Sequence, residues 1–187
     1  MRKILRIIPV VLVVVGMYLA GRSMMYYAKG AATRAFIVKA WEETKENKED
    51  TSPWGWADFH PVTSMTIPEL HIDCIVMDKI SDEALVYGPG HLSTSPLPGE
   101  HGNVVIAGHR DGEFRKLKDI AAGMMIELET KSDTFSYKVT EIDTASGSDI
   151  FWMDKTKKDC VTLITCYPFY YTGKADKRFV VRGELEP

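Results

Sequence analysis

The chain has 187 residues, of which 45% are hydrophobic and 26% are charged, a composition that fits one globular domain with an additional segment. Its 23 basic and 26 acidic residues give a formal net charge of -3. This balance provides no basic surface for nucleic acid, which we therefore exclude as a partner. The three cysteines, Cys74, Cys160 and Cys166, form no CxxC pair, and their odd number leaves at least one thiol without a disulfide partner.

The N-terminus has the pattern of a membrane anchor. Basic residues among the first six precede an uncharged, mainly aliphatic run at residues 7–20, and Arg22 closes it. This run is short for a span, because a helix rises about 1.5 Å per residue and the hydrocarbon layer is about 30 Å thick, but snorkelling arginine stems extend it. We predict an uncleaved transmembrane signal-anchor at residues 1–27, with its basic end in the cytoplasm. A cleaved signal peptide is the alternative, although Tyr18 stands where a small residue is wanted.

The rest of the chain divides into a polar linker and a β-rich region. Residues 28–52 are predicted to form a stalk, with a solvated helix face from Trp41 to Asp50. After Pro53, short β-prone runs alternate with Gly and Pro, which predicts a single domain at residues 53–187. Strands are expected at 64–67, 72–77, 103–108, 125–130, 134–142, 161–165 and 179–184, and a helix at 114–122. Seven or eight short strands with few helices favour an all-β closed barrel over a βαβ sheet.

Three residues at predicted strand ends are candidates for chemistry. Cys166 follows the β-prone run at 161–165 and precedes Tyr167-Pro168, His109 follows the run at 103–108, and Arg178 opens the last strand. Each alone fits an ordinary structural role: a buried cysteine, a structural histidine, or a surface arginine in an ion pair. Residues at strand ends also face the clefts in which active sites are built.

Together the three residue types match the needs of thiol catalysis. A thiol nucleophile requires a base or a cationic partner and a group that holds the developing oxyanion. With ordinary pKa values, a cysteine and histidine pair is a thiolate and imidazolium in only about 1% of molecules at neutral pH, which suits a slow enzyme. A guanidinium is always charged and offers forked donors to an oxyanion or a backbone carbonyl.

Several segments resemble the sortase family. The run from Thr162 to Cys166 resembles the signature TLxTC, residues 107–110 resemble the family's histidine turn, and Arg178 followed by Phe-Val-Val resembles its arginine strand. The order His, Cys, Arg is also the family's order, and the similarity extends from about Trp54 to Arg182. Residues 54–59 and 166–169 look most like the subgroup found in Gram-negative bacteria.

The resemblance implies a closed eight-stranded β-barrel with short helices and a cysteine transpeptidase that also hydrolyses. The cysteine would cleave a C-terminal LPxTG-like sorting motif of a target protein, and an amine from the cell envelope or a protein would resolve the thioacyl enzyme. His109 would protonate the leaving amine and accept a proton from the incoming one. The expected location is a cell or inner membrane, single-pass, with the catalytic domain in the periplasm or outside the cell.

No cofactor and no metal site are expected. Some sortases bind calcium, but Glu100, Glu113 and Asp119 lack a recognisable ligand spacing. His91 and His101 lie in loops that resemble the family's, and we place neither in the catalytic set. Phe151 and its two successors are expected to form an apolar wall of the substrate groove or to plug the barrel.

Three questions remain open from the sequence. Cys160 and Cys166 share one strand face about 20 Å apart, so they cannot bond to each other, whereas a Cys74–Cys160 disulfide and two unbonded thiols fit equally well. A peptidoglycan L,D-transpeptidase usually carries Ser-His-Gly-Cys, a run that is absent here. A non-catalytic, membrane-anchored β-barrel that binds or scaffolds a partner is the alternative from another functional class.

Overall fold

A computed structural model describes residues 2–149, 151–154, 156–171 and 173–186, without the side chains of residues 2–8, 10, 11 and 26. It divides the chain into two compact units, Met1–Phe36 and Ile37–Pro187. Helix α1 (Arg2–Asn47) forms the first unit and continues into the second. Among the described residues, no helix combines the length and the apolar character needed to cross a membrane. The predicted span at residues 7–20 lies partly outside the described side chains.

The last turns of α1 belong to the second unit. The sequence instead predicted a stalk for this segment. Ile37, Ala40 and Trp41 are buried, with Trp41 only 2% exposed. Lys45 Nζ lies 3.2 Å from Glu129 Oε1, so this part of the helix also makes an ion pair with the barrel. Trp41 and Thr44 of the predicted solvated face are therefore buried, whereas Glu42 and residues 46–50 are exposed. The second unit begins at Ile37, earlier than the predicted boundary at residue 53.

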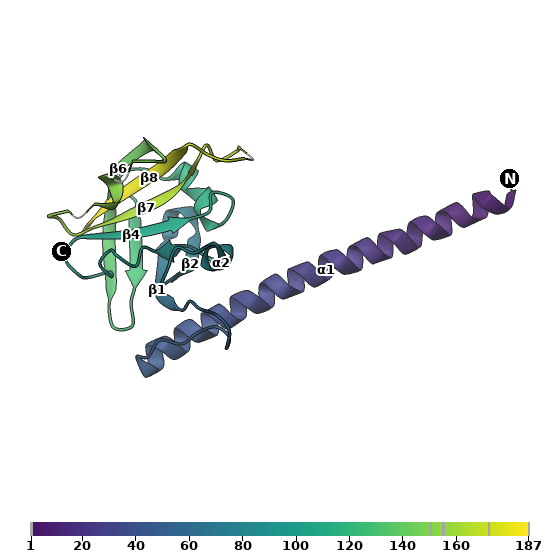
Figure 1. Ribbon diagram of the computed structural model, residues 1–187, viewed down its shortest axis with the longest axis horizontal. Helices are drawn as coiled ribbons and strands as arrows, with labels where there is room; N and C mark the ends of the chain where they lie inside the picture. The colour runs from purple at the N-terminus through teal and green to yellow at the C-terminus, as the bar shows by residue number, and fades with distance from the viewer. Residues whose placement is uncertain (1, 150, 155, 172, 187) are drawn as a thin grey trace. The chain divides into compact units, whose positions relative to one another are not determined.

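The second unit is a closed eight-stranded barrel, as predicted, with the strand order β1-β2-β3-β4-β7-β8-β6-β5 (Figure 1). The β2–β3 and β4–β7 pairs are parallel and the others are antiparallel. The strands are β1 (Pro61–Ile67), β2 (Ile72–Met77), β3 (Gly90–His91), β4 (Asn103–Gly108), β5 (Met125–Glu129), β6 (Thr134–Ser146), β7 (Cys160–Tyr167) and β8 (Lys177–Leu185). Closure is narrowest at the two-residue strand β3, which joins β2 at one residue pair and β4 at two.

Short helices connect the strands. They are η1 (Pro68–Leu70), α2 (Asp82–Tyr87), η2 (Glu113–Asp119) and η3 (Phe151–Met153). The helix expected at residues 114–122 is the shorter 3₁₀ helix η2. Helix α2 was not predicted; its N-cap is Ser81, whose Oγ accepts a hydrogen bond from Ala84 N at 3.1 Å.

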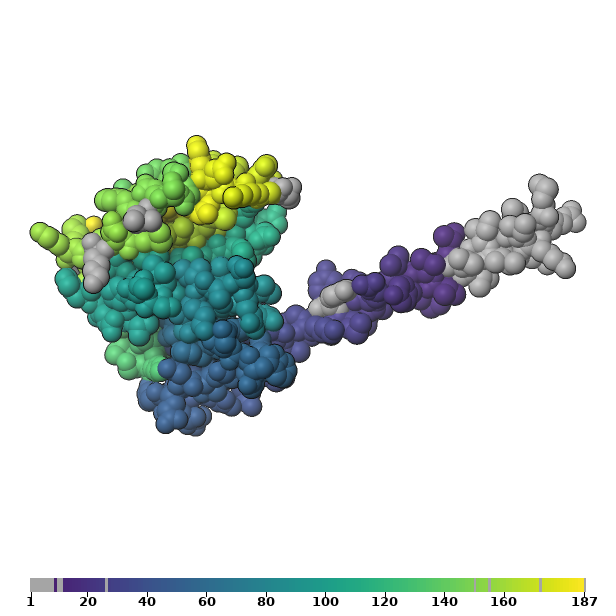
Figure 2. Space-filling view, in the orientation of Figure 1, coloured from purple at the N-terminus to yellow at the C-terminus, as the bar shows by residue number. Residues whose placement is uncertain are grey.

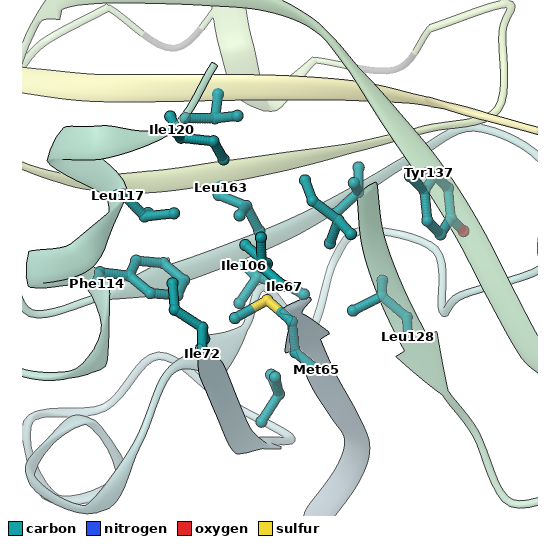
Figure 3. Close-up of a cluster of buried hydrophobic side chains, with 14 of the residues drawn as sticks. Met65, Ile67, Ile72, Ile106, Phe114, Leu117, Ile120, Leu128, Tyr137 and Leu163 are labelled. Carbon is teal, nitrogen blue, oxygen red and sulfur yellow. The ribbon is translucent and has the colours of Figure 1, made fainter. Parts of the chain in front are cut away.

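Alternation along the strands separates an inner face from an outer face. Inner-face side chains such as Met65, Ile106 and Leu163 are fully buried in the main core cluster. Figure 3 shows Phe114 and Leu117 of η2 pointing into the same cluster, so the helix closes part of the barrel interior. A Cβ on Gly108 would lie 2.8 Å from Phe114, which explains a glycine at the end of β4.

A smaller apolar cluster covers the outer face of the sheet near its C-terminal strands. Ala145, Trp152 and Val180 are buried there, with Ile164 packed against them. Trp152 belongs to η3, so the β6–β7 connection folds back over β7 and β8. In Figure 2 the teal segments from the middle of the chain border the green and yellow C-terminal segments, as the β4–β7 pairing requires.

Candidate functional site

The barrel brings the three predicted site residues onto adjacent strands. In the parallel β4–β7 pair, Gly108 is opposite Thr165, so one further step places His109 level with Cys166. In the antiparallel β7–β8 pair, Cys166 is directly opposite Arg178. Because neighbouring strands lie about 4.8 Å apart, residues that are far apart in the sequence, such as His109 and Cys166, become neighbours in one row.

All three residues belong to the outer face of the sheet. Val161 and Leu163 of β7 lie in the main core cluster, whereas Ile164 lies in the outer cluster. Cys166 is two residues beyond Ile164, and strand alternation therefore places it on the outer face. The same alternation applies to Arg178, two residues before the outer-cluster Val180, and to His109, which follows the buried inner-face Ile106 by three.

The side chains of this row differ in exposure and in partners. His109 is exposed, whereas Cys166 and Arg178 are half-buried. The Arg178 guanidinium donates to the carbonyl oxygens of Ala175 at 2.9 Å and Lys177 at 3.1 Å. Among the described residues, no hydrogen bond joins Cys166 to either His109 or Arg178. The arrangement puts a thiol, an imidazole and a guanidinium at neighbouring ends of three strands, and these are the groups that acyl transfer to a thiol requires.

The β6–β7 connection forms a wall beside this row. Asn103 at the start of β4 donates from Nδ2 to the carbonyl oxygens of Trp152 at 2.9 Å and Asp154 at 3.2 Å. Arg182 also donates to the Trp152 carbonyl, at 3.3 Å, and its guanidinium lies 4.7 Å from the Trp152 ring centroid. Trp152 is thus held on the sheet, while Phe151 is 62% exposed and available for contact. The apolar wall expected from the sequence therefore divides into one packing residue and one exposed residue.

Cys160 has a different environment from Cys166 on the same strand face. Its Sγ lies 3.3 Å from Asn103 Oδ1 and 3.3 Å from Thr156 Oγ1, and the residue is 2% exposed. Burial raises the pKa of the Cys160 thiol, which keeps it protonated and unreactive. Cys74, Cys160 and Cys166 all lie in the described part of the chain, and no disulfide joins them. The Cys74–Cys160 bond left open by the sequence is absent.

The β7–β8 loop is tied to the segment that follows β4. Arg110, next to His109, donates to the carbonyl oxygens of Pro168 at 3.2 Å and Gly173 at 2.6 Å. Its guanidinium also lies 5.6 Å from the Tyr171 ring centroid. One side chain therefore links the loop that carries His109 to the loop that begins just after Cys166.

The other candidate histidines have structural partners. His91 is 4% exposed, and its Nε2 lies 2.9 Å from the Pro96 carbonyl oxygen and 2.9 Å from Ser95 Oγ. His101 Nδ1 lies 2.6 Å from Asp159 Oδ1 at the surface. His91 is opposite Ile106 of β4, and His101 precedes the start of β4. That neither residue is catalytic stays a prediction.

His91 gives the fold a specific pH dependence. Burial lowers the pKa of His91, although the hydrogen bond to Pro96 opposes the shift. The unfolded chain therefore binds a proton near pH 6.5 that the folded chain does not, and stability falls as pH decreases below that value, by at most about 1.4 kcal/mol per pH unit. We expect His91→Gln to flatten the melting temperature profile between pH 7 and 5. An unchanged slope in His91→Gln would contradict the assignment.

No group of three or more potential ligands for a metal ion is present among the described residues. Glu113 and Asp119 are the first and last residues of η2, and Glu100 lies on the β3–β4 connection. The expectation of no metal and no cofactor stays a prediction.

Sequence reasoning missed two residues that hold connections in place: Arg110, next to the row, and Asn103, at the opposite end of β4. Asn103 and Arg110 act through backbone carbonyls of distant loops, which no sequence pattern displays. Arg110 could have been found from the sequence because it directly follows His109. Asn103 could have been found because it is a polar residue at the start of a strand whose next residues are all apolar.

Comparisons with known proteins agree with the fold. The sortase domain profile matches residues 65–186. Sortase D of Bacillus subtilis is 30% identical over 135 residues, covering 68% of each chain. The solved sortase A of Listeria monocytogenes superposes with a TM-score of 0.60 at 31% identity, over 68% of this chain and 88% of that one.

A further solved structure supports the fold over a longer stretch. The sortase D5 transpeptidase of Clostridium perfringens gives a TM-score of 0.66 at 24% identity, over 83% of this chain and 96% of that one. These relatives come from Gram-positive bacteria, so the predicted subgroup of Gram-negative bacteria finds no support among them. The profile match, the identity to a sortase D and the barrel together show that this chain belongs to the sortase family, whose members are cysteine transpeptidases.

Proposed function

We propose that this chain cleaves a C-terminal LPxTG-like sorting motif through a thioacyl bond to Cys166 and passes the acyl group to an amine. The observation that carries the proposal is the strand register, which aligns His109, Cys166 and Arg178 in one row on the outer face. In this reaction the Cys166 thiolate attacks the scissile carbonyl carbon, and His109 protonates the departing amine. His109 then takes a proton from the incoming amine as the carbon–sulfur bond breaks.

Arg178 is proposed to stabilise the oxyanion of the tetrahedral intermediate. Its guanidinium now donates to two carbonyl oxygens of its own loop. The residue is opposite Cys166 in the β7–β8 pair, so a change of side-chain rotamer turns its donors toward an acyl group on the thiol. The register with Cys166 supports this role, because an oxyanion donor has to reach the oxygen on which charge develops.

A direct test is the intact mass of the full-length chain after incubation with LPxTG-type peptides, with and without a primary amine. We expect a covalent adduct on Cys166 that decays to ligated peptide when amine is present and to hydrolysed peptide when it is absent. A folded protein with a reactive thiol that binds the peptides but forms neither adduct nor product would favour the non-catalytic binding barrel.

Arg110 is proposed to act as a positioning residue for His109. Its two hydrogen bonds hold the loop after β4 against the loop after β7, and a shift of about 1 Å between reacting groups costs roughly 10²-fold in rate. We expect Arg110→Ala to lower the acylation rate by about tenfold to 10²-fold, and Arg110→Lys to restore part of it. Exposed Arg115→Ala, on η2, is the matched control.

The pH profile of Cys166 alkylation shows whether Arg110→Ala acts by displacing His109 or by destabilising the whole fold. An imidazolium near the thiol favours the thiolate at lower pH. If Arg110 sets this proximity, the alkylation profile of Arg110→Ala should move to higher pH while its melting temperature stays near the parental one. A parental alkylation profile in Arg110→Ala would show that the residue does not position His109.

Sortases are generally extracytoplasmic, membrane-associated enzymes, and we propose the same location for this barrel. The basic N-terminal residues and the apolar run at 7–20 support attachment through the N-terminus. Fractionation of cells that make the full chain, followed by protease treatment from the outer side, tests this placement. Recovery of the barrel in the cytoplasmic fraction would contradict it.

A further inference from the structure

A pocket of 230 Å³ lies beside His109 at the end of β4. Its walls include Val86 and Tyr87 of α2 and Glu113 and Phe114 of η2. Strand β4 has β3 on one side and β7 on the other, and α2 belongs to the connection that enters β3. The pocket is therefore on the β3 side of His109, and Cys166 is on the β7 side.

The pocket has one carboxylate among mainly apolar walls. Glu113 is half-buried, and within the described residues it has no hydrogen bond or ion pair. Nearby cations are engaged elsewhere: Lys116 Nζ donates to the His71 carbonyl oxygen, and Arg110 donates to the β7–β8 loop. The carboxylate is therefore available to a cationic ligand, and the apolar walls suit an alkyl chain.

Close packing builds the pocket on the frame of the barrel. Phe114 is 1% exposed and anchors η2 in the core. A Cβ on Gly88, at the end of α2, would lie 2.8 Å from the Ile75 carbonyl oxygen, so this turn rests directly on β2. The α2 and η2 walls are thus anchored by backbone and side-chain contacts with the barrel, and His109 and Gly112 of the loop after β4 complete the lining.

We propose that this pocket receives the amine acceptor as a primary alkylammonium group, with Glu113 pairing with the cation and Val86 and Tyr87 contacting the alkyl chain. The inference rests on the proposed transpeptidase function and adds the place and the chemical class of the second substrate. His109 stands between the pocket and Cys166. An amine leaving the pocket for the thioester passes the imidazole that must take its proton.

The transfer balances in protons and bonds. The bound ammonium first loses one proton to solvent and becomes a neutral amine. Its nitrogen attacks the thioester carbonyl carbon, forming a C–N bond, and one N–H proton moves to neutral His109. The C–S bond then breaks, which releases the amide product and restores the Cys166 thiolate and the His109 imidazolium.

The test compares two nucleophiles on the thioacyl form of the full-length chain. Butylamine is cationic at neutral pH, whereas hydroxylamine is mainly uncharged. We expect Glu113→Gln to raise the half-saturating butylamine concentration about fivefold to tenfold and to leave that of hydroxylamine nearly unchanged. Val86→Lys, which places a like charge at the pocket, should have the same selective effect. Glu83→Gln, an exposed substitution on α2 outside the pocket lining, is the matched control.

The outcomes separate the pocket from the proposed function. A thioacyl adduct with equal butylamine saturation in the parent, Glu113→Gln and Val86→Lys overturns the pocket alone. Absence of any adduct in the parent overturns the proposed function, and the acceptor site falls with it. A selective loss for butylamine in both variants, with normal melting temperatures and normal adduct formation, supports the site.

Discussion

Replacing Cys166 with alanine is expected to abolish thioacyl formation while the barrel stays intact. Loss of a nucleophile lowers turnover by on the order of 10⁴-fold or more. Cys166 is half-buried at the end of β7, and no hydrogen bond of its thiol is described. The substitution should therefore change the free energy of unfolding by less than about 1 kcal/mol. Intact mass with a sorting-motif peptide and a thermal melt measure the two effects.

For Cys160→Ala, on the same strand face, we expect the reverse: lower stability with adduct formation retained. The Cys160 thiol is buried against Asn103 and Thr156, so its removal should cost about 1–2 kcal/mol of stability. Adduct formation should remain, because the pKa of this thiol is raised by burial and Cys166 is untouched. An adduct that persists in Cys166→Ala or disappears in folded Cys160→Ala would show that the nucleophile is misassigned.

The sequence predicted the barrel best where its β-prone runs correspond to strands of the structure. The run at 161–165 lies within β7, the run at 103–108 is β4 and the run at 179–184 lies within β8. Pairing of these three strands follows from a closed barrel whose order places β4, β7 and β8 side by side. A trio at three strand ends could therefore be predicted to meet, although the register itself came only from the structure.

Short elements escaped prediction for a physical reason. Strand β3 has two residues, Gly90 and His91, and α2 has six, so neither is long enough to show a hydrophobic period. Their positions depend on tertiary contacts, such as the hydrogen bond from Met77 N to Pro89 O at 2.8 Å. Helix α2 supplies one wall of the pocket beside His109, which is why no sequence pattern indicated the pocket.

The burial of α1's last turns could have been anticipated. Ile37, Ala40 and Trp41 have the i, i+3, i+4 spacing of a buried helix face. The charged residues that follow masked this pattern and suggested a solvated stalk. The supporting contacts of Arg110 and Asn103 are different, because their partners are backbone carbonyls whose locations depend on loop conformation.

Arg178→Ala is expected to lower the rate of acylation by about 10²-fold to 10³-fold, the loss typical of an oxyanion donor. Arg178 is directly opposite Cys166 in the β7–β8 pair, so its guanidinium lies on the strand next to the proposed nucleophile. Arg178→Lys should recover only part of the rate, because a lysine lacks the planar fork of donors. Lys177→Ala, the exposed neighbouring cation, controls for the loss of local positive charge.

The kinetic pattern distinguishes an oxyanion donor from a substrate-binding residue. Interactions made only in the transition state lower kcat and kcat/KM equally, whereas uniform binding raises KM alone. We expect the first pattern for Arg178→Ala, since the guanidinium faces its own loop until charge develops on the acyl oxygen. An increase in KM at constant kcat would instead place Arg178 on a carbonyl of the sorting motif, and the oxyanion would then need another donor from the row.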